Sequence, residues 1–245
     1  MPLKLVEIRE TPARTLGAPC SACEIRDVGI ICGSLTAAEL GGLQRIVSTV
    51  QCAVGQAVIH EGDPAEALFN VVAGAVKSYK LLPDGRRQIT GFLFPGDFLG
   101  IALNDTYAYT AEALQATRLC RFPRRRMEAL LAEYPNLGQR LLVEASNELV
   151  AAQDQMLLLG RKTAKERLAS FLLAQSERAT RLGRPNSSVG LPMSRGDIAD
   201  YLGLTTETIS RTFTQLRRAG VIRQSDRGAI EIVQRKALRA LTEGG

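Results

Sequence analysis

Apolar and polar positions alternate with two different periods along this chain, and each period predicts its own kind of secondary structure. From about residue 51 to residue 121, short apolar or alternating runs are separated by turn residues such as Gly62, Pro83 and Gly85. The clearest runs cover residues 57–60, 68–72, 76–82 and 88–94. Short strands at this spacing predict an antiparallel roll of the sandwich or jelly-roll class.

Helical periodicity appears on both sides of this β-rich region. Thr36 and Glu39 are spaced as a capping box, so we expect a helix to begin there. A long helix is expected from Pro135 to about Leu159, continuing as helix over residues 161–179.

The long helix carries apolar positions that alternate at spacings of three and four, which is the a/d pattern of a coiled coil. This seam consists of Leu142, Ala145, Leu149, Ala152, Met156 and Leu159. One interpretation is a helix packed on the roll of its own chain. The interpretation we favour is the seam of a parallel homodimer.

Two short helices joined at Gly203 are predicted between residues 194 and 218. Ser194 and Asp197 give the first helix a capping-box-like start. Apolar residues fall on one face of each helix, at Ile198, Ala199 and Leu202 and at Ile209, Phe213 and Leu216. Strands around a turn at residues 226–228 add a β-wing, so this segment is predicted to be a winged helix-turn-helix.

The opposite face of the second helix carries Glu207, Ser210 and Arg211 near its N-terminus. A recognition helix meets base edges in the major groove with this end. Glutamate can accept from the cytosine amino group, and arginine can fork onto guanine. We therefore expect sequence-specific binding of double-stranded DNA, the alternative being an ordinary helical hairpin with solvated charges.

Charge is unevenly distributed along the chain. Residues 161–245 contain 16 Lys and Arg against 8 Asp and Glu, whereas residues 1–160 contain 15 against 17. A basic surplus in the DNA-reading segment suits phosphate neutralisation. The candidate phosphate contacts are Arg217, Arg218, Arg223 and Arg227, each of which could instead be a solvated surface arginine.

Three of the five cysteines, Cys20, Cys23 and Cys32, lie in an irregular N-terminal arm. Grouped thiolates select zinc or iron–sulfur centres, and the residues alone do not choose between them. Cys52 is expected to be a buried small apolar residue. His60, in an apparent strand, is expected to be structural.

Other features narrow the function class. No apolar run approaches the roughly 20 residues of a membrane span, and the N-terminus lacks a signal-peptide core, so we expect a cytoplasmic protein without a membrane partner. A single histidine and the lack of a catalytic motif argue against an enzyme.

A β-roll, a dimer helix and a winged helix-turn-helix in this order resemble the cyclic-AMP receptor protein superfamily. Residues 85–92 (Gly-Arg-Arg-Gln-Ile-Thr-Gly-Phe), 153–159 (Gln-Asp-Gln-Met-Leu-Leu-Leu) and 207–211 (Glu-Thr-Ile-Ser-Arg) resemble its FNR (fumarate and nitrate reduction) type, the bacterial oxygen-responsive regulators. The resemblance implies an α+β chain with four parts. These are a cysteine-bearing arm (1–33), an antiparallel β-roll sensor domain (34–132), a dimerisation helix (133–160) and a winged helix-turn-helix domain (161–245).

The resemblance also implies a ligand, a target and partners. Cys20, Cys23, Cys32 and Cys120 would hold one [4Fe-4S] cluster per chain, and oxygen would dismantle it. At low oxygen a homodimer would bind a TTGAT-N4-ATCAA palindrome, with Glu207, Ser210 and Arg211 reading the bases, and would contact RNA polymerase. A superfamily regulator with zinc, a thiol redox switch or another small-molecule signal is the alternative.

Three departures from the family pattern change this expectation. Eight residues separate Cys23 from Cys32, more than is usual for the family, although a flexible loop absorbs that length at small entropic cost. Tyr109-Thr110 occupies the place of the arginine-serine pair that holds a cyclic phosphate, so no cyclic-AMP binding is expected. Ala152 stands where an acidic residue can oppose pairing, so we expect the dimer to persist in part without a cluster.

Overall fold

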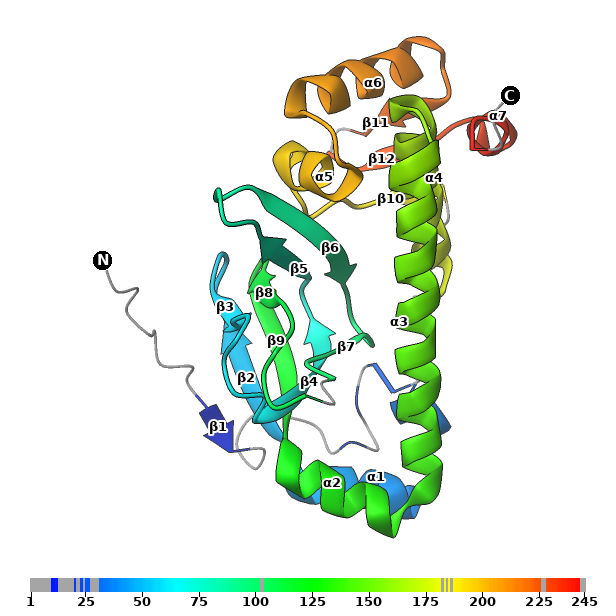
Figure 1. Ribbon diagram of the computed structural model, residues 1–245. Helices are drawn as coiled ribbons and strands as arrows, with labels where there is room; N and C mark the ends of the chain where they lie inside the picture. Colours follow the sequence, from blue (N-terminus) through cyan, green and yellow to red (C-terminus); the bar gives the residue numbers. More distant parts are fainter. Residues whose placement is uncertain are drawn as a thin grey trace. The chain divides into compact units, whose positions relative to one another are not determined.

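The chain divides into two compact units in the computed structural model (Figure 1). The first contains Met1–Lys80 and Thr90–Glu148, and the second contains Leu81–Ile89 and Leu149–Gly245. The structure describes residues 10–12, 20, 23, 25–26, 31–101, 104–181, 183, 185, 187–225 and 228–242.

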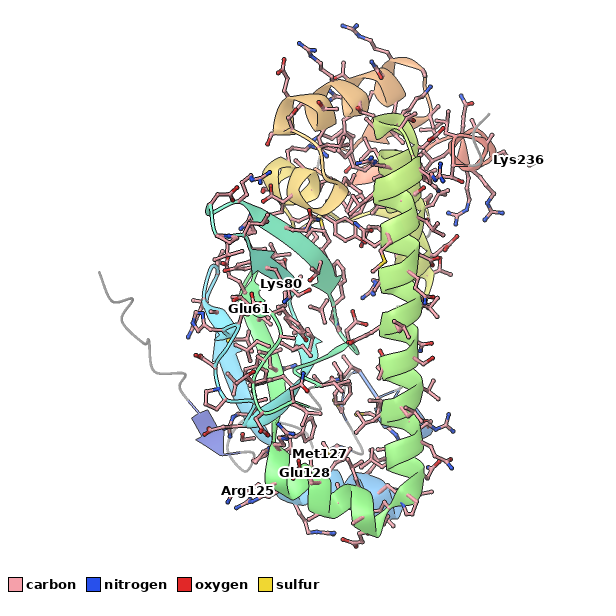
Figure 2. All side chains as sticks on the ribbon, in the orientation of Figure 1. Glu61, Lys80, Arg125, Met127, Glu128 and Lys236 are labelled. Carbon is pink, nitrogen blue, oxygen red and sulfur yellow. The ribbon has the colours of Figure 1, made fainter. Side chains whose placement is uncertain are left out.

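The first unit contains the predicted roll, built from two antiparallel sheets. One sheet has the order β1-β2-β9-β4-β7, with bounds Glu10–Pro12, Ser48–Cys52, Thr117–Pro123, Ala67–Ala73 and Phe98–Leu99. The other has the order β3-β8-β5-β6, with bounds Ala57–Ile59, Thr110–Ala113, Val76–Leu81 and Arg87–Leu93. Lys80 of β5 pairs with Glu61, which follows β3, at 2.8 Å (Figure 2).

Strand β9 separates two apolar clusters because successive side chains point to opposite faces of a sheet. Leu119 lies opposite Val50 and Val71 in the register, and all three are fully buried in the cluster inside the roll. Cys120 and Phe122 belong instead to the cluster on the other face, which the helices of the first unit cover. The fourth predicted ligand thus sits outside the roll's interior.

The helices of the first unit are α1 (Ala37–Ile46), α2 (Arg124–Glu133) and the start of α3 (Pro135–Arg161). The predicted capping box is confirmed, because Glu39 Oε2 accepts from the Thr36 N–H at 2.7 Å while the Thr36 hydroxyl accepts from the Glu39 N–H.

Helix α2 was not predicted from the sequence, which suggested only that a basic run ends the roll. Met127 is buried in the helix-covered cluster, whereas Arg125 and Glu128 of the same helix are exposed (Figure 2). Its single apolar face is short, so its period is hard to separate from that of a loop.

The second unit contains the predicted winged helix-turn-helix. Its helices are α4 (Ala164–Arg181), α5 (Arg195–Leu202), α6 (Thr206–Arg218) and α7 (Arg235–Ala240). A small sheet has the order β10-β12-β11, with bounds Ser188–Val189, Ile230–Ile232 and Ile222–Gln224. All six apolar residues predicted to join α5 and α6 are buried.

Three sequence expectations were wrong. Helix does not continue unbroken past Arg161, because Thr163 and Glu166 form a further capping pair that starts a new helix, α4. The arm is not wholly irregular, since Glu10–Pro12 pairs with β2. His60 is not in a strand but lies exposed just after β3.

Gly203→Ala is expected to destabilise the second unit by about 1–2 kcal/mol, the cost of a left-handed backbone for a residue with a Cβ. Gly203 ends α5 with φ 62°, and an added Cβ would lie 3.1 Å from a Leu159 methyl group. Thermal unfolding measures the effect. Gly196→Ala is the matched control, because Gly196 is helical with room for a methyl group, and an equal loss there would contradict this account.

Candidate DNA-binding surface and cysteine site

Helix α6 presents the three predicted base-reading residues on its exposed face. Arg211 and Glu207 are 75% and 70% exposed and pair with each other at 2.6 Å. The Ser210 hydroxyl donates to the Thr206 carbonyl at 2.8 Å. Exposed pairs of this kind are worth little, so DNA can replace these contacts with its own.

The start of α6 is fixed by its cap. The Thr205 hydroxyl accepts from the Thr208 N–H at 3.1 Å, which satisfies one of the open N–H groups of the first turn. On the inner side, Ile209 and Phe213 are buried against the rest of the unit. The cap and the buried side thus fix the exposed face near this N-terminus, the end with which a recognition helix meets a major groove.

The structure places three of the four predicted phosphate contacts. Arg217 donates to the Thr214 hydroxyl at 3.2 Å, and Arg218 is exposed. Arg223 on the wing forks onto Glu231 with distances of 2.9 and 2.6 Å, so a phosphate would compete with this carboxylate. Arg227 lies outside the described residues.

Arg195 is a cation on this surface that the sequence reasoning missed. Its guanidinium lies 3.3 Å from the centroid of the Phe213 ring. Burial and the nearby Arg217 lower the pKa of Arg195, which indicates that two cations gather beside α6. In the sequence, Arg195 only follows the N-cap residue Ser194, and this position does not reveal the contact with Phe213. The contact is made by tertiary packing.

Helix α3 exposes an apolar stripe along the predicted seam. Leu142, Leu149 and Met156 are 70%, 61% and 71% exposed. A second row of exposed apolar residues consists of Val143, Val150 and Leu157. Contiguous exposed apolar surface marks an interaction site.

The other predicted row of the seam is more varied. Ala145 is half-buried and Ala152 is exposed. Leu159 is half-buried, and its methyl group lies near the α5–α6 turn at Gly203. The C-terminal end of the predicted seam, at Leu159, therefore also packs near the turn of the helix-turn-helix.

The four predicted ligands, Cys20, Cys23, Cys32 and Cys120, are all half-buried free thiols. Three of them, Cys20, Cys32 and Cys120, pack against the helix-covered cluster. Burial, together with the charges of neighbouring arm cysteines, raises the pKa of Cys32 and of Cys120 to about 12. The four sulfur atoms are thus close enough to interact electrostatically.

The four cysteines do not yet have the geometry of a metal-binding site. Within the part of the chain that the structure describes, no three His, Cys, Asp or Glu side chains are already arranged to hold an ion. The donor set nevertheless fits a four-thiolate centre, because soft sulfur ligands from the arm and from β9 meet at one apolar cluster.

Cys52 and the pair Tyr109-Thr110 all lie in the roll. Cys52 is 3% exposed in the interior of the roll, as predicted, and burial raises its pKa to about 11. The Tyr109 hydroxyl accepts from the Gly100 N–H at 3.0 Å, and the Thr110 hydroxyl accepts from the Glu61 N–H at 3.0 Å. Both hydroxyls at the expected cyclic-phosphate position are already engaged with the backbone.

Comparisons with known proteins agree with both halves of this architecture. The model of the cyclic nucleotide-binding domain matches residues 49–134, and that of the Crp-like helix-turn-helix domain matches residues 166–241. No helix among the described residues is long and apolar enough to cross a membrane.

Individual relatives are transcription regulators. The chain is 46% identical to the nitrogen fixation regulation protein FixK of Bradyrhizobium diazoefficiens over 83% of this chain and 85% of that one. It is 38% identical to the transcriptional activator FnrL of Cereibacter sphaeroides over 92% of each chain. The structure of FixK2 from Bradyrhizobium japonicum superposes with a TM-score of 0.76 at 39% identity, covering 80% of this chain and 97% of that one. The chain therefore belongs to the Crp/Fnr family and is a DNA-binding transcription activator of that type.

Proposed function

We propose that this activator senses oxygen through a [4Fe-4S] cluster and, at low oxygen, binds a TTGAT-N4-ATCAA palindrome as a homodimer that contacts RNA polymerase. The observation that carries the proposal is that Cys20 and Cys32 of the arm and Cys120 of β9 pack on one apolar cluster, with Cys23 near enough to raise the pKa of Cys120. When bound, such a cluster supplies a redox centre that oxygen can oxidise. Similarity to FnrL and to the transcriptional activator anr of Pseudomonas aeruginosa supports the regulatory part of this assignment.

The chain offers a physical route from the cysteines to the seam. Cys20, Cys32 and Cys120 pack on the cluster that also contains Leu137 and Leu141 of α3. Tethering the arm at Cys20 and Cys32 would hold this cluster closed and fix the start of α3. Releasing the arm would loosen that packing, so two states of α3 would differ in stability.

The same stripe on α3 supports the homodimer. A second copy of α3 would cover Leu142, Leu149 and Met156, each burial being worth about 1.5–3 kcal/mol. A two-fold dimer would bring two copies of α6 to successive major grooves, which suits a palindromic site.

Leu149→Glu is expected to weaken dimerisation by about 100-fold or more, because both copies lose an apolar contact and gain facing charges. Sedimentation velocity at micromolar concentration measures the dissociation. Leu81→Glu is the matched control, since Leu81 is 58% exposed outside α3.

Wild-type protein should remain partly dimeric even without iron, because Ala152 brings no acidic pair into the seam. An iron-free wild type that is wholly monomeric would refute the expectation of a persistent dimer.

The proposal is tested by iron, acid-labile sulfide and the visible spectrum of protein purified without oxygen. We expect about four irons per chain and a brown absorbance that air removes. Colourless protein or bound zinc would reject the cluster and leave a Crp/Fnr activator with a zinc site or a thiol redox switch.

A further inference from the structure

The C-terminal end of α5 is held by side chains from three other segments of the second unit. A helix leaves its last four carbonyl groups without partners inside the helix. Here the Ala199 carbonyl accepts from the Leu204 N–H at 3.0 Å, and the Asp200 carbonyl accepts from the Gln88 amide at 2.8 Å. The Tyr201 carbonyl accepts from Gln155 of α3 at 2.7 Å.

The fourth carbonyl completes the pattern. Arg167 of α4 donates to the Leu202 carbonyl at 2.9 Å and, through another nitrogen, to the Leu159 carbonyl at 2.7 Å. Every open carbonyl at this helix end therefore has a donor. The turn that sets the angle between α5 and α6 starts directly after it, at Gly203.

A charged clamp acts on the outer face of the same helix. Arg87 donates to both Asp197 and Asp200, with distances of 3.0 Å to Asp197 and 2.7 Å to Asp200. The Asp197 side chain is 9% exposed and also accepts from the N–H of the N-cap residue Ser194, and the Arg87 side chain is 28% exposed. Partial burial makes such charge-assisted bonds stronger than exposed pairs.

The positions of these donors in the chain give them a role. The polypeptide passes between the two units at three points, on either side of Leu81–Ile89 and between Glu148 and Leu149. Arg87 and Gln88 lie in the first of these segments, and Gln155 lies shortly after the third crossing. The segments that connect the units covalently thus carry the side chains that hold α5.

We propose that Arg87, Gln88 and Gln155 are positioning residues for DNA reading: they fix α5, and through it the recognition helix α6, from the two segments that continue into the sensor unit. None of them is exposed on the reading face of α6. They limit the orientations that α5 can adopt. This lowers the entropic cost of ordering α5 and α6 when α6 enters the groove. This role rests on the DNA-binding activity of the family and is independent of the cluster.

The experiment compares full-length Arg87→Gln with Arg86→Gln in DNA binding by fluorescence anisotropy, on the palindromic and on a random duplex at fixed salt. Arg86 is the matched control, because it is the adjacent arginine and pairs with Asp84 on its own turn. Arg87→Gln should lower palindrome affinity about tenfold and random-duplex affinity less than about twofold, whereas Arg86→Gln should change neither.

A double-mutant cycle separates positioning from general stability. Asp200→Asn removes one of the two carboxylates that Arg87 holds, so it should lower palindrome affinity in the same direction but by less than Arg87→Gln, and the two together should not add. Gln155→Ala provides a second variant without a charge change and should also lower the palindrome-to-random ratio. Additive effects, equal losses on both duplexes, or wild-type binding by Arg87→Gln would overturn the proposal.

Discussion

Arg211→Ala is expected to weaken binding to the TTGAT-N4-ATCAA palindrome by at least about 30-fold. An arginine forked onto guanine is worth about 1–3 kcal/mol of discrimination, and a dimer uses two of them. The variant also leaves Glu207 without its 2.6 Å partner on a surface that faces phosphates. Fluorescence anisotropy with the palindrome and with a duplex altered at the contacted guanine measures both affinity and discrimination.

Arg218→Ala is the matched comparison on the same helix, because Arg218 is exposed at the C-terminal end of α6, about two turns beyond Arg211. It should weaken binding to both duplexes alike and reduce the salt dependence, as expected of a phosphate contact. If Arg211→Ala instead lowered both affinities equally, Arg211 would be a phosphate contact and the base-reading assignment would be wrong.

Cys120→Ala is expected to abolish iron binding, from about four irons per chain to fewer than about one, because a four-thiolate centre loses the only ligand on the roll. Cys120 is the partner that joins the arm cysteines to β9 and the helix-covered cluster. Iron analysis and the visible spectrum of anaerobic protein measure the loss, and low-oxygen DNA affinity should fall with it.

Cys52→Ala is the control for this experiment. Cys52 is buried inside the roll, on the other side of the sheet from the arm cysteines, and its replacement removes a thiol without touching the grouped set. Full iron content in this variant is expected. Iron retained by Cys120→Ala, or lost with Cys52→Ala, would show that the ligand set is misassigned.

The sequence predicted those parts of the fold whose signals are local. The capping boxes at Thr36 and Ser194, the turn at Gly203 and the strand run at residues 68–72 each depend on neighbouring residues, and the structure confirms them. The break after Arg161 was missed because its capping pair, Thr163 and Glu166, interrupts an otherwise unbroken helical pattern.

The features that sequence reasoning could not find are made by distant contacts. Arg195 lies against α6 because its guanidinium stacks on Phe213, eighteen residues away. Arg87 meets Asp197 and Asp200 across more than a hundred residues of chain. Periodicity carries no information about such pairs, since each residue alone is typical of a solvated surface.

Oxygen control of DNA binding is tested most directly by measuring the DNA affinity of one anaerobically purified sample before and after exposure to air. The palindrome and a scrambled duplex are used at the same salt concentration, and iron is followed in parallel. We expect tight binding to the palindrome at first, with palindrome affinity falling as the brown absorbance disappears. Palindrome affinity that stays constant while air removes the absorbance, or protein that never contains iron, would contradict oxygen control of DNA binding.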